Sequence, residues 1–342
     1  MNASDCHLDV AGSPDPMNLK PLLDQPFLDQ SFPLPVDEPF TTAMAYAEGV
    51  TRANLVRLVD LGFLRRPIRN VYVSTQLGDS PLLRAKCLAL VVPPDCVVCD
   101  RHAGWLLGAE MILAPNEHLD LSAISMFRPS DHGRLRNPLA DSGERNLVPS
   151  DIMEVAGLLV TTPLRTAWDL GRVRSRERTL AALDAMLRTR LFTHEELLDG
   201  VTRFRGMRWV RNLRALAPMA DGAAASPGES ILRLRWLDRG LPRPQLQVEV
   251  WVDGVLAALL DIAHEDLRFA AEYDGAEWHG SPAQQEHDRR RRELVREQGW
   301  VVTPFVASDV FGRERRCDQM LLDGVRQART LRGSLIDSAS RL

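Results

Sequence analysis

The spacing of hydrophobic and polar positions changes several times along the chain, and each change predicts an element. Apolar residues in 52–61 recur with a helical period, and Gly62 ends that helix. The following stretch, "FLRRPIRNVYVS", predicts two short strands with a turn at 67–70. A helical segment followed by a small hairpin predicts a winged helix-turn-helix over residues 41–80.

The middle of the chain, residues 81–218, predicts an α/β region. Thr162 and Pro163 are typical of a helix start, as N-cap and first-turn residue. A short strand is expected at 96–99, and mixed strands and loops between 113 and 162. Further helices are predicted at 81–90, 102–107, 178–200 and 205–217.

The C-terminal part, residues 229–330, predicts the order α-β-β-β-α-β-α. Two apolar stretches, "QLQVEVWV" and "VLAALLDIA", flank an Asp-Gly pair that is typical of a tight hairpin turn. A mixed sheet flanked by helices follows from this order. Residues 219–228 predict a small-residue linker, and the Pro- and Asp-rich residues 1–40 predict a disordered tail. The fold class expected is therefore α/β (α+β).

Composition limits the class of protein. The 342 residues carry a net charge of −4, so the chain as a whole is no basic nucleic-acid coat, although local basic surfaces stay possible. No apolar segment approaches the roughly 20 residues that span a bilayer, and no secretory signal is visible. The five cysteines lack framework spacing and are expected to be reduced thiols. We therefore expect a cytoplasmic protein without membrane contact.

Three carboxylates occupy half-buried positions of the C-terminal sheet. Glu272 and Asp274 share one face of a strand, and "AHEDLR" predicts the turn that brings Asp261 opposite Glu272. Two carboxylates about 5 Å apart share a proton or hold a cation. Oxygen ligands without thiolates favour Mg²⁺ or Mn²⁺. The alternative is that these residues are solvated on the exposed face of a sheet.

The polar helix after this strand adds an arginine. His287, Arg291 and Leu294 lie on one helix face, and Leu294 is expected to point at the sheet. Arg291 would then reach the sheet and contact a phosphate through its planar guanidinium. For the other arginines of "DRRRR", a solvated charged face is the preferred interpretation.

The C-terminal residues resemble a known family. The segments "LLDIA", "EYDGAEWH", "HDRRRRELVREQGW" and "VVTPFVASDV" are similar to bacterial domains related to the very-short-patch-repair endonuclease, in the PD-(D/E)xK restriction-endonuclease-like superfamily. The resemblance covers about 229–327. It implies Asp261 and Glu272 as metal ligands and a helix-borne acid near the metal. The further residues that it implies for the site are Glu229, Asp274, His279, Asp288 and Arg291.

One residue departs from the superfamily signature. Asp274 occupies the position of the signature lysine, and a carboxylate cannot donate as a lysine does. His279, His287 or Arg291 could supply the missing function, or the metal alone could suffice. The other possibility is that catalysis is lost and DNA binding or a scaffold role remains.

The front of the chain resembles a second family. "LVRLVDLGFLRRPIRNVYVS" and "TTPLRTAWDLGR" are similar to proteins with the AbiEi-type antitoxin winged-helix domain, over roughly 42–215. The resemblance implies DNA binding, with Arg65, Arg66 and Arg69 as phosphate contacts, and a cognate toxin as a possible partner. Phosphate contacts give affinity without sequence choice.

Three functions follow from these observations. The first is a DNA-binding protein with a metal-dependent endonuclease-like domain that hydrolyses phosphodiester bonds. The alternative is a non-catalytic, antitoxin-like DNA-binding regulator with a degenerate nuclease fold. The third, a scaffold without a nucleic-acid partner, follows from the net negative charge.

Overall fold

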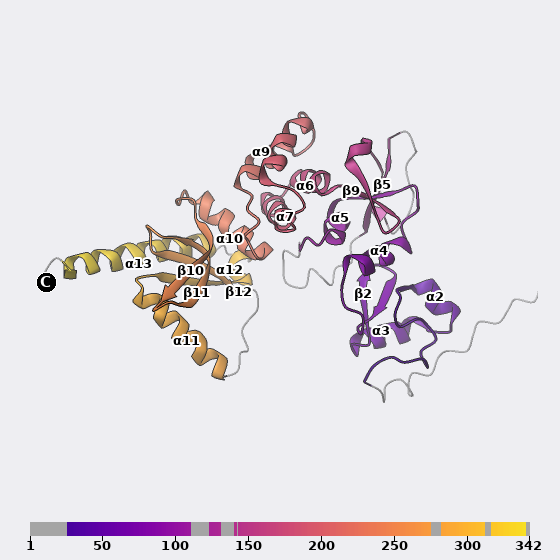
Figure 1. The fold of residues 1–342 in the computed structure, drawn as a ribbon, viewed down its shortest axis with the longest axis horizontal. Coiled ribbons are helices and arrows are strands. Elements are labelled where there is room, and N and C mark those ends of the chain that lie inside the picture. The colour runs from indigo at the N-terminus through magenta and orange to yellow at the C-terminus, as the bar shows by residue number, and fades with distance from the viewer. Residues whose placement is uncertain are drawn as a thin grey trace, which may run out of the picture. The chain divides into compact units, whose positions relative to one another are not determined.

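The computed structural model describes residues 26–110, 123–130, 140–141, 143–274, 282–311 and 316–339, with only the backbone described at 144, 282–288 and 333–339. The chain divides into two compact units, which Figure 1 colours by residue number. The first comprises Met1–Val98 and Leu121–Val160, and the second comprises Cys99–Asp120 and Thr161–Leu342. Within the described residues, helices and three sheets occur together, which confirms the predicted α+β class.

The first unit contains two sheets. One has the strand order β1-β3-β2, and the other the order β6-β5-β4-β9-β8, with β7 pairing β5. The elements of this unit are β1 (Phe40–Thr41), α2 (Thr42–Ala47), α3 (Arg52–Asp60), β2 (Leu64–Ile68), β3 (Val71–Ser74), α4 (Pro81–Ala89), β4 (Val97–Val98), β5 (Ile124–Pro129), β6 (Ala140–Asp141), β7 (Glu144–Arg145), η2 (Pro149–Asp151), β8 (Ile152–Val155) and β9 (Leu158–Thr161).

The predicted helix and hairpin of the N-terminal segment are present. Thr51 caps α3 by accepting from the Asn54 amide, and Gly62 after the helix has a φ of 79°, which favours glycine. Strands β2 and β3 pair antiparallel across a turn at Asn70. The arrangement α2-α3-β2-β3 agrees with the predicted winged helix-turn-helix, and residues 41–80 are called the winged-helix segment below.

The predicted disordered tail is wrong for its described part. Leu28, Phe32 and Leu34 are buried and pack with Phe40 in the core of the winged-helix segment. Burial of these side chains stabilises residues 26–40 against that core. Residues 1–25 lie outside the described residues.

The second unit joins a helical bundle to a four-stranded sheet. Its elements are α5 (Asp100–Leu106), α6 (Pro163–Gly171), α7 (Arg176–Arg188), α8 (His194–Asp199), η3 (Gly200–Phe204), α9 (Val210–Leu216), η4 (Ala217–Met219), α10 (Pro227–Asp238), β10 (Gln245–Val252), β11 (Val255–His264), β12 (Phe269–Asp274), α11 (Pro282–Glu297), β13 (Val301–Val306), α12 (Ala307–Phe311) and α13 (Arg316–Ala339). The helices predicted through 178–200 are α7 and α8, and between them Arg190 has a left-handed φ of 59°.

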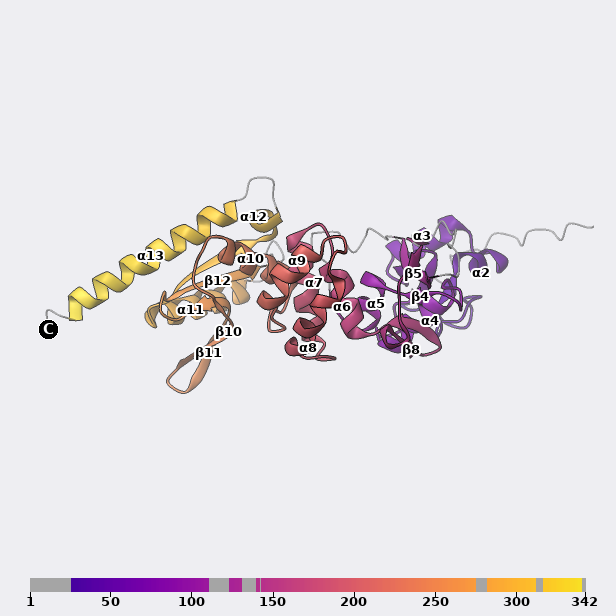
Figure 2. The same ribbon diagram turned by 90° about the horizontal axis from the view of Figure 1, so that it is seen from above.

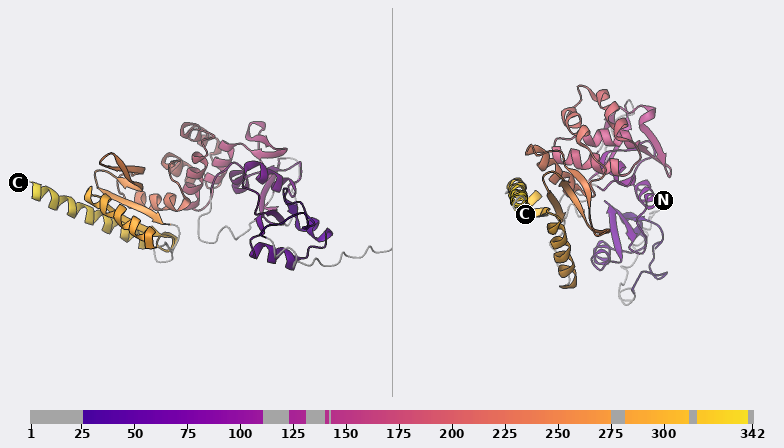
Figure 3. Two further views of the ribbon diagram at one scale, coloured as in Figure 1. Left: turned by 60° about the horizontal axis from the view of Figure 1, so that its bottom comes forward. Right: turned by 60° about the vertical axis from the view of Figure 1, so that its left-hand side comes forward.

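The sheet of the second unit has the order β10-β11-β12-β13. The first three strands are antiparallel and β13 is parallel to β12, as a mixed sheet requires. Figure 2 shows the long hairpin of β10 and β11, whose turn is the predicted Asp253-Gly254 pair. One apolar cluster joins the sheet to α10, α12 and α13, and another joins it to Val295 of α11. In Figure 3 the yellow helix of the C-terminal part runs beside the orange sheet.

Helix α10 belongs to both the bundle and the sheet domain. Its Arg233 donates to the Asp184 carboxylate of α7 over 2.6 Å and to the Met219 carbonyl over 2.5 Å, while the Asp221 amide donates to Asp184 over 2.8 Å. Ala224 is fully buried. Residues 219–228, predicted as a small-residue linker between domains, are thus a packed connection inside one compact unit.

This buried pair generates a stability prediction. Asp184→Ala leaves the Arg233 guanidinium buried without its counter-charge, so the free energy of unfolding should fall by about 3–5 kcal/mol. Chemical denaturation of the full chain measures the change. The control is Glu293→Gln, which removes an exposed pair with Arg289 and should cost less than about 1 kcal/mol. Equal effects of the two substitutions would contradict the structural role of Asp184.

Candidate functional site

Two of the predicted carboxylates lie on neighbouring strands. The ladder between β11 and β12 pairs Ile262 with Ala271, so Asp261 and Glu272 are the next residues along each strand. Directly opposed residues of antiparallel strands point to the same side of the sheet. The predicted turn lies between His264 and Phe269, as the pairing of these two residues requires. The register therefore agrees with the adjacency that the sequence predicts.

Asp261 has a structural contact of its own. Its Oδ2 accepts from the backbone N–H of Tyr273 over 2.9 Å, at the point where the regular ladder has ended at Ile262 and Ala271. The carboxylate thus replaces a strand partner for this amide. Gly228 of α10 allows the approach of the Tyr273 ring, because a Cβ there would lie 2.1 Å from it. The side-chain amide of Gln247 in β10 also forms a hydrogen bond to Asp261.

Arg291 reaches the sheet, but in an ion pair. Its guanidinium donates to Glu272 Oε1 over 2.6 Å, and both side chains are partly exposed. The predicted face of α11 is correct at Arg291 and wrong at Leu294, which is 39% exposed, whereas Val295 is buried. Arg291 and Val295 are four residues apart and share the buried face. The side chains of His287 and Asp288 lie outside the described residues.

Glu229 belongs to the start of α10. Ser226 is the N-cap and accepts from the Glu229 amide, while Glu229 Oε2 accepts from the Ala225 amide over 2.9 Å. The sequence Ser-Pro-Gly-Glu is therefore a capping signature, a signal for Glu229 that the sequence reasoning did not use. The same Oε2 accepts from Gln247 of β10 over 3.2 Å. Glu229 is 6% exposed, so these bonds satisfy a buried carboxylate.

The electrostatics of the acids show that they share one environment. Burial raises the pKa of Glu229, and the nearby charge of Asp261 raises it further. Burial also raises the pKa of Glu272, against the lowering effect of Arg291. For Asp261, burial raises the pKa, the Tyr273 amide and Arg291 lower it, and the charge of Asp274 raises it. Acids from α10, β11 and β12 therefore lie close enough to affect one another.

The donor set of this acidic site (Glu229, Asp261, Glu272 and Asp274) suits a hard divalent cation in part. Mg²⁺ in proteins takes one or two carboxylates and fills its other positions with water and substrate phosphate oxygens. Asp261 and Glu272 can supply two such carboxylates. Among the described residues no three His, Cys, Asp or Glu side chains group as a metal site, so no larger cage is formed there. His279 lies outside the described residues.

The predicted phosphate contacts of the winged-helix segment differ from one another. Arg65 donates to the Leu77 carbonyl over 3.1 Å and lies 4.0 Å from Asp79, so it joins the hairpin to the following loop. Arg66 lies over the Tyr72 ring. Arg69 is exposed at the hairpin turn and is the member of this group that faces solvent most fully.

Helix α3 presents two arginines that the sequence reasoning did not select. Arg52 and Arg57 are exposed, whereas Asn54, Leu55 and Leu58 hold the opposite face in the core. The spacing of the apolar residues in 52–61 already indicated which positions face solvent. Arg52 and Arg57 therefore extend the candidate nucleic-acid interface from the hairpin to α3.

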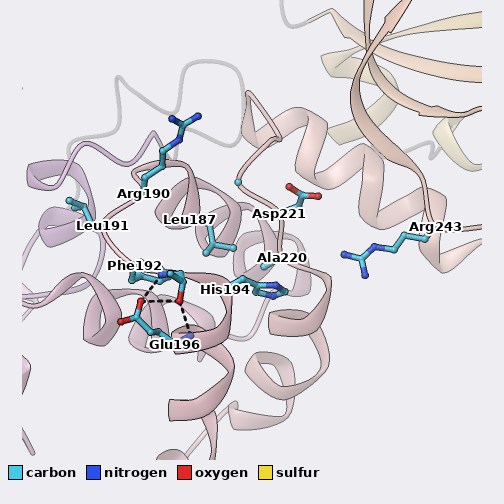
Figure 4. Close-up of a pocket in the computed structure, with 11 residues that line it drawn as sticks. Leu187, Arg190, Leu191, Phe192, His194, Glu196, Ala220, Asp221 and Arg243 are labelled. Carbon is cyan, nitrogen blue, oxygen red and sulfur yellow. Dashed lines mark hydrogen bonds between the residues drawn. The ribbon is translucent and has the colours of Figure 1, made fainter.

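A separate pocket of about 650 Å³ lies near α8 (Figure 4). None of the predicted site residues lines it. Two of the polar side chains that line it bond to the protein: His194 Nε2 contacts the Ala217 carbonyl over 2.7 Å, and Glu196 accepts from the Thr193 amide over 2.7 Å. The bonds between Thr193 and Glu196 cap α8, and the bond of His194 connects α8 to η4. Both are structural contacts of the bundle.

Part of the chain matches a known protein family. Residues 97–219 match the family described as AbiEi antitoxin C-terminal domain. The chain is also similar to two proteins of Mycobacterium tuberculosis: Uncharacterized protein MT2308 of strain CDC 1551 / Oshkosh and Uncharacterized protein Rv2248 of strain ATCC 25618 / H37Rv. Each is 36% identical over 209 residues, which cover 61% of this chain and 76% of the relative. The chain belongs to the same family as these two proteins.

The match confirms the antitoxin part of the resemblance in a coarser form. It covers the C-terminal domain of AbiEi antitoxins, whereas the sequence analysis pointed to their winged-helix domain. The relation of residues 229–327 to the repair endonuclease stays a prediction, as do the site residues and the metal. No helix of the described residues has both the length and the apolar character needed to cross a membrane.

Asp261 generates a pH prediction. Burial raises its pKa above the ordinary value of 3.8, so its contribution to stability is greatest below pH 3.8 and is lost as the pH rises through the raised pKa. Asp261→Asn keeps an oxygen for the Tyr273 amide and has no such loss. The free energy of unfolding of the Asp261→Asn variant minus that of the natural chain should therefore increase from acid to neutral pH. Denaturation with a chelator at several pH values measures this, and a difference that is constant with pH would contradict it.

Proposed function

We propose that the chain is an antitoxin-like regulator that binds DNA through its winged-helix segment. The observation that carries the proposal is the match of residues 97–219 to the AbiEi antitoxin C-terminal domain. It supports a regulator with a cognate toxin as its functional counterpart. The proposal goes further than this match in naming DNA as a partner and in naming the residues that contact it.

The charge of the winged-helix segment supports nucleic acid as its ligand. Residues 41–80 carry five arginines and three carboxylates, a net charge of +2, although the whole chain carries −4. The exposed arginines lie on α3 and on the β2–β3 turn, the two elements with which a winged helix meets a duplex. Arginine contacts to phosphates provide affinity that falls as salt rises.

DNA binding can be tested with point variants. Arg57→Ala combined with Arg69→Ala should weaken binding to a labelled duplex, because phosphate contacts are lost. The slope of log affinity against log salt should become shallower by about one for each lost contact. Fluorescence anisotropy at several salt concentrations measures both quantities.

The control for this experiment is Arg214→Ala, which removes an exposed arginine of α9 outside the winged-helix segment. It should leave the affinity and the slope unchanged. If the double variant kept the slope of the natural chain, phosphate contact by Arg57 and Arg69 would be rejected.

A second candidate function is hydrolysis of DNA phosphodiester bonds at the acidic site. The approach of acids from α10, β11 and β12 supports it, since like charges are otherwise unfavourable at such distances. Asp261 and Glu272 would hold Mg²⁺ or Mn²⁺. When bound, the ion would supply Lewis-acid polarisation and a more acidic water.

The side chains of this site define what each would do. Glu229 and Asp274 would keep the site anionic, and Asp274 cannot donate as the superfamily's lysine would. Arg291 would turn from Glu272 toward a substrate phosphate, for which a guanidinium is well suited. The ion pair with Glu272 would thereby be exchanged for an ion pair with the substrate.

Nuclease assays separate the two candidates. If the second is correct, the full chain cleaves duplex, mismatched or single-stranded DNA with Mg²⁺ or Mn²⁺, and Asp261→Ala reduces cleavage to the level seen with chelator. Glu265→Ala, which removes an exposed acid of the β11–β12 turn, should leave cleavage unchanged. Metal-independent DNA binding without cleavage supports the regulator alone, and cleavage that persists in Asp261→Ala rejects this site as its source.

A further inference from the structure

A basic surface lies where η3 passes into α9, far along the chain from the winged-helix segment. Between Asp199 and Asp221 the sequence has five arginines and no carboxylate, although the whole chain carries a net charge of −4. Arg205, Arg208 and Arg211 are exposed, and within the part of the chain that the structure describes none of them forms an ion pair. The surface therefore presents positive charge that the chain does not neutralise.

The stability of α9 does not account for these residues. The start of a helix carries partial positive charge, so arginine is unfavourable there and acids are preferred. The first turn of α9 contains Arg211 and no acid. Trp209 is the N-cap residue and makes no capping bond, whereas Ser, Thr, Asp or Asn would provide one. Arginine and tryptophan at these positions therefore indicate a role outside the helix.

Trp209 exposes an aromatic ring beside the charges. The side chain is 37% exposed, and the guanidinium carbon of Arg208 lies 5.2 Å from the centre of the ring. A guanidinium binds phosphate through its planar fork, and an exposed ring stacks on an unpaired base. An acidic peptide would meet the charges but would leave the ring without a flat partner. Charge and ring together favour single-stranded nucleic acid.

The surface is fixed at both of its ends. Before it, Phe204 is buried with its ring centre 5.6 Å from that of Trp168, and the guanidinium carbon of Arg172 lies 4.5 Å from the Phe204 ring centre. The Met207 amide donates to the Phe204 carbonyl over 3.1 Å, which closes a turn. After it, Val210 is buried in the core of the bundle. A segment held in this way loses little conformational entropy when it binds.

We propose that Arg205, Arg208, Trp209 and Arg211 form a binding surface for single-stranded nucleic acid. The arginines contact phosphates, and an unpaired base stacks on the ring of Trp209. The surface belongs to the second unit, so the proposal depends neither on duplex binding by the winged-helix segment nor on the acidic site. RNA and DNA share the phosphate and base chemistry that this surface recognises, and the experiment distinguishes them.

Base stacking is tested with labelled oligouridylate and oligothymidylate of about 12 nucleotides, added to the full chain in the presence of a chelator. Trp209→Ala should weaken binding by about 5–100-fold, because the stacked base is lost. Fluorescence anisotropy measures the affinity, and the tighter of the two oligonucleotides identifies RNA or DNA as the preferred ligand. The matched control is Trp251→Ala, which removes a tryptophan that is 55% exposed on β10 and should leave both affinities unchanged.

Phosphate contact is tested with a second variant, which combines Arg208→Gln with Arg211→Gln. Glutamine keeps a polar side chain at these exposed positions, so the thermal midpoint should be retained. The slope of log affinity against log salt should become shallower by about 0.7 for each lost contact. The matched control combines Arg326→Gln with Arg329→Gln, which removes the same charge from exposed positions of α13 and should leave the slope unchanged.

Each outcome decides the proposal. Weaker binding in both variants, with both controls unchanged, supports the surface. Failure of the natural chain to bind either oligonucleotide, or unchanged affinity in Trp209→Ala, would overturn it without affecting duplex binding by the winged-helix segment. Polyglutamate that binds as tightly as the oligonucleotides, and loses affinity in the double arginine variant, would assign the surface to an acidic protein partner instead.

Discussion

The second unit depends on a charge held inside it. Asp184 of α7 and Arg233 of α10 are both buried, and each has further hydrogen bonds to the chain around residues 219–221. A buried pair contributes little net stability compared with apolar residues, but either partner alone is strongly unfavourable. The pair therefore fixes how α10 meets the bundle. Since α10 also carries Glu229 and packs on the sheet, the geometry of the acidic site depends on this contact.

The acidic site combines features of a structural and of a functional cluster. Glu229 caps α10 and Asp261 receives a strand amide, contacts that any folded sheet could use. Burial nevertheless raises the pKa of Glu229, Asp261 and Glu272, so the fold gathers three acids where their charged forms are disfavoured. Such an arrangement is typical of sites whose stability is sacrificed for binding or catalysis.

Much of the fold could be predicted from local signals. The Asp253-Gly254 turn, the order of elements along the chain and the adjacency of Asp261 and Glu272 all follow from period and turn chemistry. The rest depended on tertiary contacts. Leu28 is buried only because the winged-helix core accepts it, and Val295 rather than Leu294 faces the sheet because of how α11 is rotated. The left-handed φ of Gln247 within β10 is encoded by no sequence period.

The pairing of Asp184 with Arg233 has a consequence for how such chains can diversify. Recombination that exchanged the sheet domain for another would have to carry α10 with it. Otherwise the buried carboxylate of Asp184 would lose its partner Arg233. Shuffling at residues 219–228 would therefore be selected against, in spite of their small side chains. The bundle and the sheet domain would be inherited together as one module.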